Sequence, residues 1–146
     1  MHEKEKAILI SGATGSGKTP LGCYLHKHGF RGISFFHFDF GEELRKTADR
    51  PARYPDLSDS EHLIIQSSLR ESTLLSDAQF PVAKKIFRGF LKTTPHSGQR
   101  LIVLNGLPRR VSQAERVSAL VNIIGIITLH ATPETVRKRI ADNTGK

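Results

Sequence analysis

Four short apolar runs divide the chain. They are residues 7–11 (AILIS), 33–38 (ISFFHF), 101–104 (LIVL) and 123–129 (IIGIITL). None of them alternates cleanly between apolar and polar side chains, as a strand with one solvated face would. Continuous apolar runs of this length are typical of strands buried on both faces, which belong to parallel sheets covered by helices. The pattern therefore predicts four central strands.

Helical patterns occupy the segments between these runs. One helix is predicted for residues 18–28, and a longer amphipathic helix is predicted after the polar segment 42–75. Its apolar stripe consists of Ala83, Ile86, Phe87 and Phe90. Pro81 then falls in the first turn of that helix, where its missing N–H costs little. Strands that alternate with helices predict a doubly wound α/β fold, a parallel sheet with helices on both faces.

Two further helices are marked by their first residues. Ser112 and Glu115 have the spacing of a capping box, so we expect a helix over residues 113–120. Thr132 and Pro133 read as the N-cap and the first helical position of the last helix.

Residues 42–75 differ from the rest of the chain. The segment is polar, contains Pro51 and Pro55, and connects the second strand to the long amphipathic helix. We expect a small helical insertion there rather than a second domain, so residues 1–146 form a single domain.

Charge narrows the classes of partner. The formal net charge is +8 and the sequence pI is about 10.0, which favours an anionic partner. The cations are scattered in short clusters, and neither a long basic run nor an aromatic stacking motif is present, so nucleic acid is not expected. No apolar run is long enough to span a membrane. The single cysteine, Cys23, suits a reducing compartment, and a cytoplasmic location is expected.

The segment GATGSGKT follows the first predicted strand and precedes the first predicted helix. It matches the phosphate-binding pattern G-x-x-x-x-G-K-[ST] and comprises Gly12, Ala13, Thr14, Gly15, Ser16, Gly17, Lys18 and Thr19. Backbone N–H groups of such a loop and the positive end of the following helix hold phosphate oxygens. Lys18 is expected at the β- and γ-phosphates and Thr19 at Mg²⁺. ATP and Mg²⁺ are the predicted cofactors.

A second group of polar residues follows the third predicted strand. The strand ends at Asn105, where a P-loop protein commonly has a carboxylate that orients Mg²⁺. The GLPR turn then places Arg109 just beyond the carboxyl end of the strand, where ligands bind in open α/β sheets. A guanidinium there can hold a phosphate through two parallel hydrogen bonds.

With these motifs the sequence resembles the adenylate kinase family and, more broadly, the nucleoside monophosphate kinases. The similar segments are GATGSGKT, FGEELR at residues 40–45, LLSDAQFPVAKKIF at 74–87, GLPRRVSQ at 106–113 and TPETVRKRI at 132–140. They cover nearly the whole chain in the family's order. The resemblance implies transfer of a phosphoryl group from Mg²⁺-bound ATP to a nucleoside monophosphate.

The resemblance also implies roles for individual residues. Arg45 and Arg109 would clamp the phosphate of the acceptor, Gln113 would contact its base, and Gly41 would allow its close approach. Arg139 would touch the phosphates from the last helix and, with Lys18 and Arg109, would take part in catalysis. Residues 42–75 would be the acceptor-binding insertion.

The chain departs from the family pattern in three ways. Thr19 follows Lys18 directly where the family usually has another glycine, and Asn105 replaces the usual acidic residue. Asp39, at the end of the second strand, is then a candidate for the carboxylate at Mg²⁺ or for binding an acceptor hydroxyl. The lid and last strand of the family would follow Lys146, so they are expected to be absent from this chain.

Two alternative functions follow from these departures. Asp39 could hold the hydroxyl of a hydroxy acid or sugar in a different P-loop kinase. Asn105 and the expected lack of a lid also fit a non-catalytic ATP-binding module. The base of the acceptor and the oligomeric state stay open.

Overall fold

The computed structural model describes residues 3–96 and 98–144. Its strands are β1 (Lys6–Ser11), β2 (Ser34–Asp39), β3 (Arg100–Asn105) and β4 (Asn122–Thr128). They form one parallel sheet in the order β2-β3-β1-β4. The four predicted strands are confirmed, with bounds that shift by about one residue, the usual uncertainty of an element's ends. The fold is the predicted α/β architecture.

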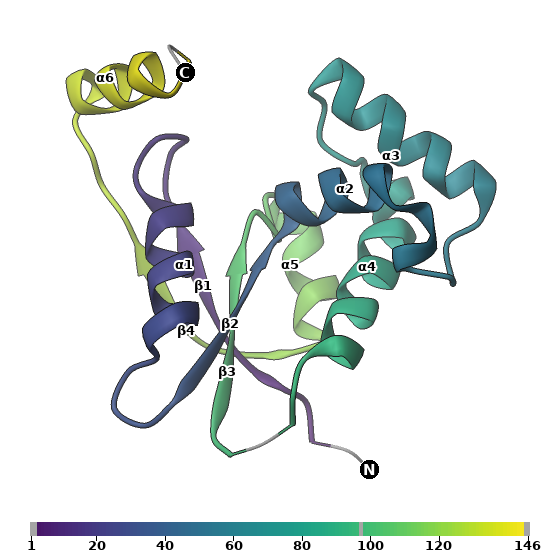
Figure 1. Ribbon diagram of the computed structural model, residues 1–146, viewed down its shortest axis with the longest axis horizontal. Coiled ribbons are helices and arrows are strands. Elements are labelled where there is room, and N and C mark those ends of the chain that lie inside the picture. Colours follow the sequence, from purple (N-terminus) through teal and green to yellow (C-terminus); the bar gives the residue numbers. More distant parts are fainter. Residues whose placement is uncertain (1–2, 97, 145–146) are drawn as a thin grey trace.

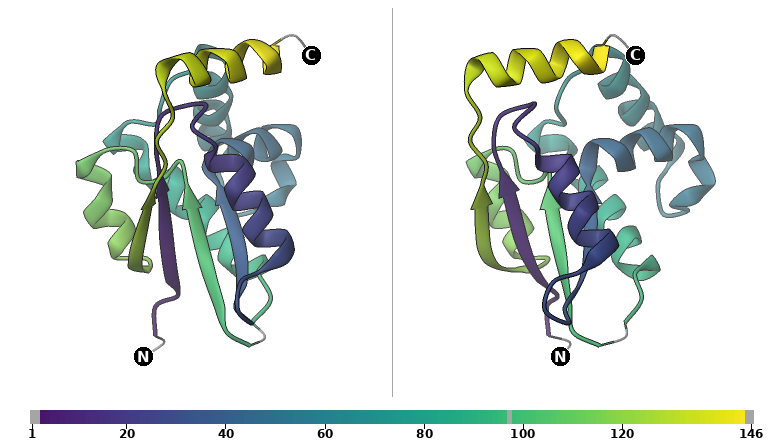
Figure 2. Two further views of the ribbon diagram at one scale, coloured as in Figure 1. Left: turned by 90° about the vertical axis from the view of Figure 1, so that its left-hand side faces the viewer. Right: turned by 60° about the vertical axis from the view of Figure 1, so that its left-hand side comes forward.

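Helices cover both faces of the sheet (Figure 1). Helix α1 (Lys18–His28) packs on one face, over a buried cluster of Ile10, Phe35 and Val103. Helices α4 (Phe80–Thr93) and α5 (Val111–Ser118) lie on the opposite face, over the larger core that contains Phe38. Helix α6 (Pro133–Thr144) crosses above the carboxyl ends of the strands (Figure 2).

The insertion after β2 is helical, as predicted. It contains α2 (Phe40–Asp49), a short 3₁₀ helix (Pro51–Arg53) and α3 (Asp59–Glu71), and a second 3₁₀ helix (Asp77–Gln79) precedes α4. Helix α2 begins at Phe40, directly after β2, because Oδ1 of Asp39 accepts the backbone N–H of Glu42 at 3.1 Å and caps the helix.

Tyr54 anchors the insertion to α4. Its side chain is buried, and the ring lies on the bare backbone of Gly89, where an added Cβ would be 2.3 Å from Cδ1 of Tyr54. The Tyr54 hydroxyl donates to Oε2 of Glu43 at 2.5 Å. The insertion therefore packs on the core through a ring fitted against a glycine.

The predicted helix starts had different outcomes. Thr132 caps α6 by accepting the N–H of Thr135 at 3.1 Å, as predicted. The capping box of Ser112 and Glu115 is wrong: α5 begins at Val111 with Arg110 at the N-cap and no side-chain cap. Ser112 lies inside the first turn, and its hydroxyl donates to Oδ1 of Asp77 at 3.0 Å instead. None of the described helices is long and apolar enough to cross a membrane.

Candidate active site

The phosphate-binding loop connects the central strand β1 to α1. Gly12, Gly15 and Gly17 have φ of 153°, 82° and 104°, a backbone that residues with side chains rarely adopt. Nζ of Lys18 lies against the loop itself and donates to the carbonyls of Gly12 at 2.5 Å and Ala13 at 3.0 Å. Burial and the nearby Arg109 guanidinium lower the pKa of Lys18, and Asp39 acts in the opposite direction.

The ends of β2 and β3 bring two polar side chains to Thr19 at the start of α1. Asp39 and Asn105 are register partners at the carboxyl edge of the sheet. The Thr19 hydroxyl donates to Oδ2 of Asp39 at 3.1 Å, and Nδ2 of Asn105 donates to Oγ1 of Thr19 at 3.2 Å. A carboxylate, a hydroxyl and an amide oxygen at one edge are ligands that Mg²⁺ accepts. The residues present therefore fit the predicted metal role of Thr19 and Asp39.

His37 joins this group, and the sequence analysis missed it. Its Nε2 lies 3.1 Å from Nδ2 of Asn105, and its Nδ1 lies 3.8 Å from Sγ of Cys23. Burial lowers the pKa of His37, while Asp39 acts to raise it. No cluster of three or more His, Cys, Asp and Glu side chains suited to a metal occurs among residues 3–96 and 98–144.

Helix α6 lies over the phosphate-binding loop. Nη1 of Arg139 donates to the carbonyl of Gly15 at 3.0 Å. A Cβ on Gly15 would be 3.1 Å from Cγ1 of Val136, so the loop and the helix are in close contact. Arg139 is thus placed beside the loop, and its role at the phosphates stays a prediction.

Around the loop is a cavity of about 730 Å³, called here the phosphate cavity. Residues of the loop, the strand ends and α6 line it: Thr14, Gly15, Ser16, Gly17, Lys18, Thr19, Pro20, Asp39, Gly41, Arg45, Asn105, Arg109, Arg139 and Asp142. The cavity brings together most of the predicted site residues.

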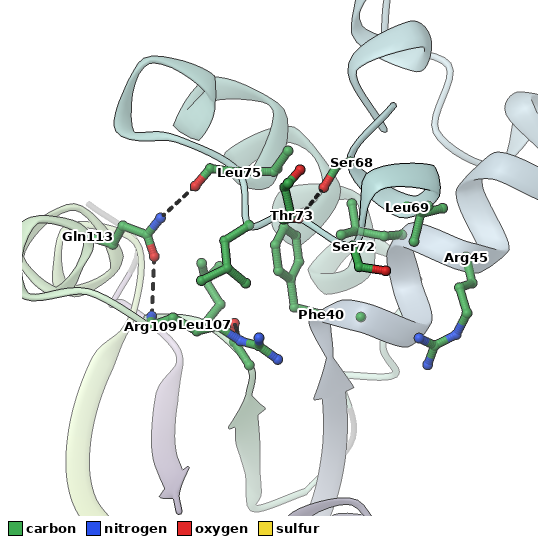
Figure 3. Close-up of a pocket in the computed structure, with 14 residues that line it drawn as sticks. Phe40, Arg45, Ser68, Leu69, Ser72, Thr73, Leu75, Leu107, Arg109 and Gln113 are labelled. Carbon is green, nitrogen blue, oxygen red and sulfur yellow. Dashed lines mark hydrogen bonds between the residues drawn. The ribbon is translucent and has the colours of Figure 1, made fainter. Parts of the chain in front are cut away.

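A second cavity of about 410 Å³, called here the acceptor cavity, lies between the insertion and the loop after β3 (Figure 3). Its walls are Phe40, Gly41, Leu44, Arg45, Ser68, Leu69, Ser72, Thr73, Leu74, Leu75, Gly106, Leu107, Arg109 and Gln113. Gly41, Arg45 and Arg109 line both cavities. These three residues form the shared wall.

The two arginines of the shared wall come from different elements. Figure 3 shows Arg45, on α2, and Arg109, in the loop after β3, reaching into the cavity from opposite sides. Both residues are exposed. Nη2 of Arg45 donates to Oε2 of Glu42 at 2.9 Å, and Nε of Arg109 donates to the carbonyl of Gly106 at 3.2 Å. Each guanidinium keeps further N–H groups for an anion.

Gln113 is 5% exposed, and its amide bridges two backbone segments. Its Oε1 accepts the N–H of Arg109 at 3.2 Å, and its Nε2 donates to the carbonyl of Leu75 at 3.4 Å (Figure 3). Gln113 also lines the acceptor cavity, so contact with a base stays a prediction. The amide of Gln113 fixes the loop that carries Arg109.

Polar residues in the last turn of α3 and directly after it complete the acceptor cavity, and the sequence analysis missed them. Ser68 donates to the carbonyl of Thr73 at 2.6 Å, and Ser72 has a left-handed backbone with φ of 53°. No motif marks these residues, because only the fold of the chain brings them to the same cavity as Leu107. Asp, Glu, His and Lys are all absent from the walls of this cavity as the described residues form it.

Comparison with known proteins gives one kind of match. No protein-family model matches the chain, and no curated protein matches its sequence. Among solved structures, a gluconokinase from Sinorhizobium meliloti 1021 is similar, with a TM-score of 0.54 and 17% sequence identity over 99% of this chain and 69% of that chain. The likeness shows that this chain has a P-loop kinase fold. It leaves adenylate kinase as one reading within that fold.

Proposed function

We propose that this chain transfers a phosphoryl group from Mg²⁺-bound ATP to a nucleoside monophosphate. The wall that the two cavities share carries the proposal. A donor nucleotide at residues 12–19 and an acceptor phosphate between Arg45 and Arg109 would meet at that wall. Holding donor and acceptor in line is the main requirement of phosphoryl transfer.

The chemistry of the acceptor cavity supports an acceptor that is already an anion. An alcohol acceptor needs a group that takes its proton, whereas a phosphate monoester is ionised at neutral pH. The described walls of the cavity contain two arginines and no carboxylate or imidazole. Asp39 lines the phosphate cavity instead, where it caps α2 and accepts the Thr19 hydroxyl.

In the proposed reaction the residues of the chain bind and orient. Lys18 would exchange the carbonyls of Gly12 and Ala13 for phosphate oxygens, and the arginines would offset charge on the transferring group. Thr19 and Asp39 would hold Mg²⁺, which supplies further charge compensation when bound with the nucleotide. The need for ATP and Mg²⁺ and the single Cys23 support a cytoplasmic location.

A second candidate is a kinase of a hydroxy acid or sugar. It is favoured by the similarity to a structure that is described as a gluconokinase. In that case Arg45 and Arg109 would bind a carboxylate, and Asp39 would have to turn towards the acceptor hydroxyl.

Phosphorus NMR decides between these candidates. The chain is incubated with ATP and Mg²⁺ and, in turn, with AMP, GMP, CMP, UMP, dTMP, gluconate and shikimate. We expect one of the nucleoside monophosphates to be converted to its diphosphate, and we expect Lys18→Met to abolish this conversion. Lys27→Met, a change at an exposed lysine on the same helix, is the matched control and should react normally. A phosphate ester of gluconate or shikimate, or ATP binding without any transfer, would contradict the proposal.

A further inference from the structure

Asn105 occupies the place where a P-loop kinase commonly has a carboxylate, and its surroundings are specific. The side chain is 4% exposed. Its Nδ2 lies 3.2 Å from Oγ1 of Thr19 and 3.1 Å from Nε2 of His37. An amide nitrogen has two N–H groups and can donate to both atoms at once. Asn105 is therefore held between the first turn of α1 and a histidine of β2.

The orientation of this amide follows from counting protons. The Thr19 hydroxyl has a single proton, which it donates to Oδ2 of Asp39 at 3.1 Å. If the amide oxygen and nitrogen of Asn105 were exchanged, the single Thr19 proton would face two acceptors, Oδ2 of Asp39 and Oδ1 of Asn105. With Nδ2 towards Thr19 and His37, all three hydrogen bonds form together. Nε2 of His37 must then be the acceptor.

The same orientation leaves the carbonyl oxygen of Asn105 available. No residue in the described part of the chain donates a hydrogen bond to Oδ1, although Asn105 lines the phosphate cavity. A carbonyl oxygen is a ligand that Mg²⁺ or its bound water accepts. Asn105 can therefore offer an oxygen at this edge without carrying a charge.

We infer that His37 is a positioning residue of the phosphate cavity. Its Nε2 holds the amide of Asn105 so that the carbonyl oxygen of Asn105 serves the divalent cation of the bound nucleotide in place of a carboxylate. The inference rests on the proposed use of a cation-bound nucleotide. It does not depend on which acceptor is phosphorylated.

Gly22 gives His37 the room to do this. A Cβ at Gly22 would lie 2.3 Å from Nε2 of His37, so the imidazole packs on the bare backbone of α1. The contact holds Nε2 of His37 within hydrogen-bond distance of Nδ2 of Asn105. Gly22→Ala would displace the ring without removing any polar group, and alanine favours a helix over glycine.

The first test measures binding of the cation rather than activity. Mn²⁺ is titrated into the chain with a non-hydrolysable ATP analogue, and free Mn²⁺ is followed by electron paramagnetic resonance. We expect His37→Phe to weaken Mn²⁺ binding about tenfold, a usual loss for a residue that orients a metal ligand. His37→Gln should restore affinity to within about twofold, because its amide oxygen can accept the Asn105 N–H.

Two further variants complete the set. Gly22→Ala should weaken Mn²⁺ binding as His37→Phe does. His26→Phe is the matched control: His26 also contacts β2, where its Nδ1 accepts the N–H of His37 at 3.2 Å, but it does not touch Asn105. It should bind Mn²⁺ normally. Thermal melting confirms that each variant is folded. Unchanged affinity in His37→Phe or in Gly22→Ala, or no recovery in His37→Gln, overturns the inference.

The second test determines which ring nitrogen of His37 carries the proton in the unaltered chain. Nitrogen-15 NMR of the histidine rings should find the His37 proton on Nδ1 and an unprotonated Nε2. A proton on Nε2 overturns the inference, because that nitrogen could not accept from Asn105. Both tests are independent of phosphoryl transfer. A chain that binds Mn²⁺ as described and phosphorylates no monophosphate contradicts the proposed function alone.

Discussion

At the scale of single residues, two neighbouring arginines have different surroundings. Arg109 lines both cavities, whereas Arg110 is the exposed N-cap residue of α5 and lines neither of them. The two side chains carry the same charge and are adjacent in sequence. They therefore separate the effect of position from the effect of net charge.

Arg109→Ala should reduce kcat/KM for phosphoryl transfer about 10²–10³-fold, the usual loss when one charge-stabilising donor is removed from an active site. Arg110→Ala should leave it unchanged. Steady-state kinetics with the preferred monophosphate measures both. Equal losses in the two variants would show that general electrostatic attraction, rather than a bound phosphate, explains the effect.

Tyr54 gives a prediction about stability and pH. Burial and the Glu43 carboxylate raise the pKa of Tyr54 from 10.0 to about 12. In the unfolded chain the phenol of Tyr54 has its ordinary pKa of about 10. The neutral hydroxyl therefore stabilises the folded state fully below that pH, and this stabilisation is lost as the pH rises towards about 12. The excess stability of the wild type over Tyr54→Phe should shrink over this interval. Urea denaturation at several pH values tests it.

Tyr24 provides the control, since it is 60% exposed. Tyr24→Phe should follow the wild type at every pH. A difference between wild type and Tyr54→Phe that stays constant from neutral to alkaline pH would contradict the assignment.

The sequence shows some of these residues and hides others for a physical reason. Lys18 and Thr19 could be predicted because all parts of the phosphate-binding loop are consecutive in the chain. His37 could not, because its partner Asn105 is near only after folding, and Ser68 could not, because no motif marks it as a residue of the cavity. A histidine in an apolar strand reads as a core residue until its neighbour is known.

At the scale of elements, Gln113 connects the start of α5 to the insertion. It accepts from the backbone of Arg109 and donates to the backbone of Leu75. Gln113→Leu keeps the size of the side chain but leaves both backbone groups without these partners. We expect a loss of about 2 kcal/mol in the free energy of unfolding and a raised KM for the acceptor.

Gln66→Leu, on the exposed side of α3, is the matched control and should change neither quantity. Urea denaturation and steady-state kinetics measure the two effects. If Gln113→Leu is as stable as the wild type and only the choice of base changes, the bridge between Arg109 and Leu75 contributes little.

Elements were predicted well where one local pattern decides them. The strands follow from continuous apolar runs, and α4 follows from its stripe and Pro81. The start of α5 was not predicted correctly, because the Ser112 hydroxyl donates to Asp77, which is distant in sequence. A hydroxyl with a tertiary acceptor does not need the cap that its spacing suggests.

At the scale of the whole molecule, the net charge of +8 acts on any anionic ligand. Association of a fluorescent ATP analogue should slow as ionic strength rises from about 0.01 M to about 0.15 M, where screening shortens from about 30 Å to about 8 Å. Dissociation should change much less, because contacts inside the cavity are screened less. Stopped-flow fluorescence gives both rates.

Single-stranded DNA serves as the comparison. Because the cations are scattered along the sequence in short clusters, it should bind weakly and lose affinity steeply with salt. Tight DNA binding that competes with the nucleotide would contradict the expectation that nucleic acid is not a partner.

The shared wall has a consequence for how such a protein can change over generations. The residues proposed to hold the donor are concentrated in one loop, whereas the acceptor cavity is assembled from α2, α3, the segment after α3 and the loop after β3. Among the residues that the structure describes, only Gly41, Arg45 and Arg109 belong to both. Substitutions at Leu69, Thr73 or Leu74 can therefore reshape the acceptor cavity while the donor half is inherited intact. If the proposed function holds, a duplicated copy of this chain could acquire a new acceptor without first losing its nucleotide-binding loop.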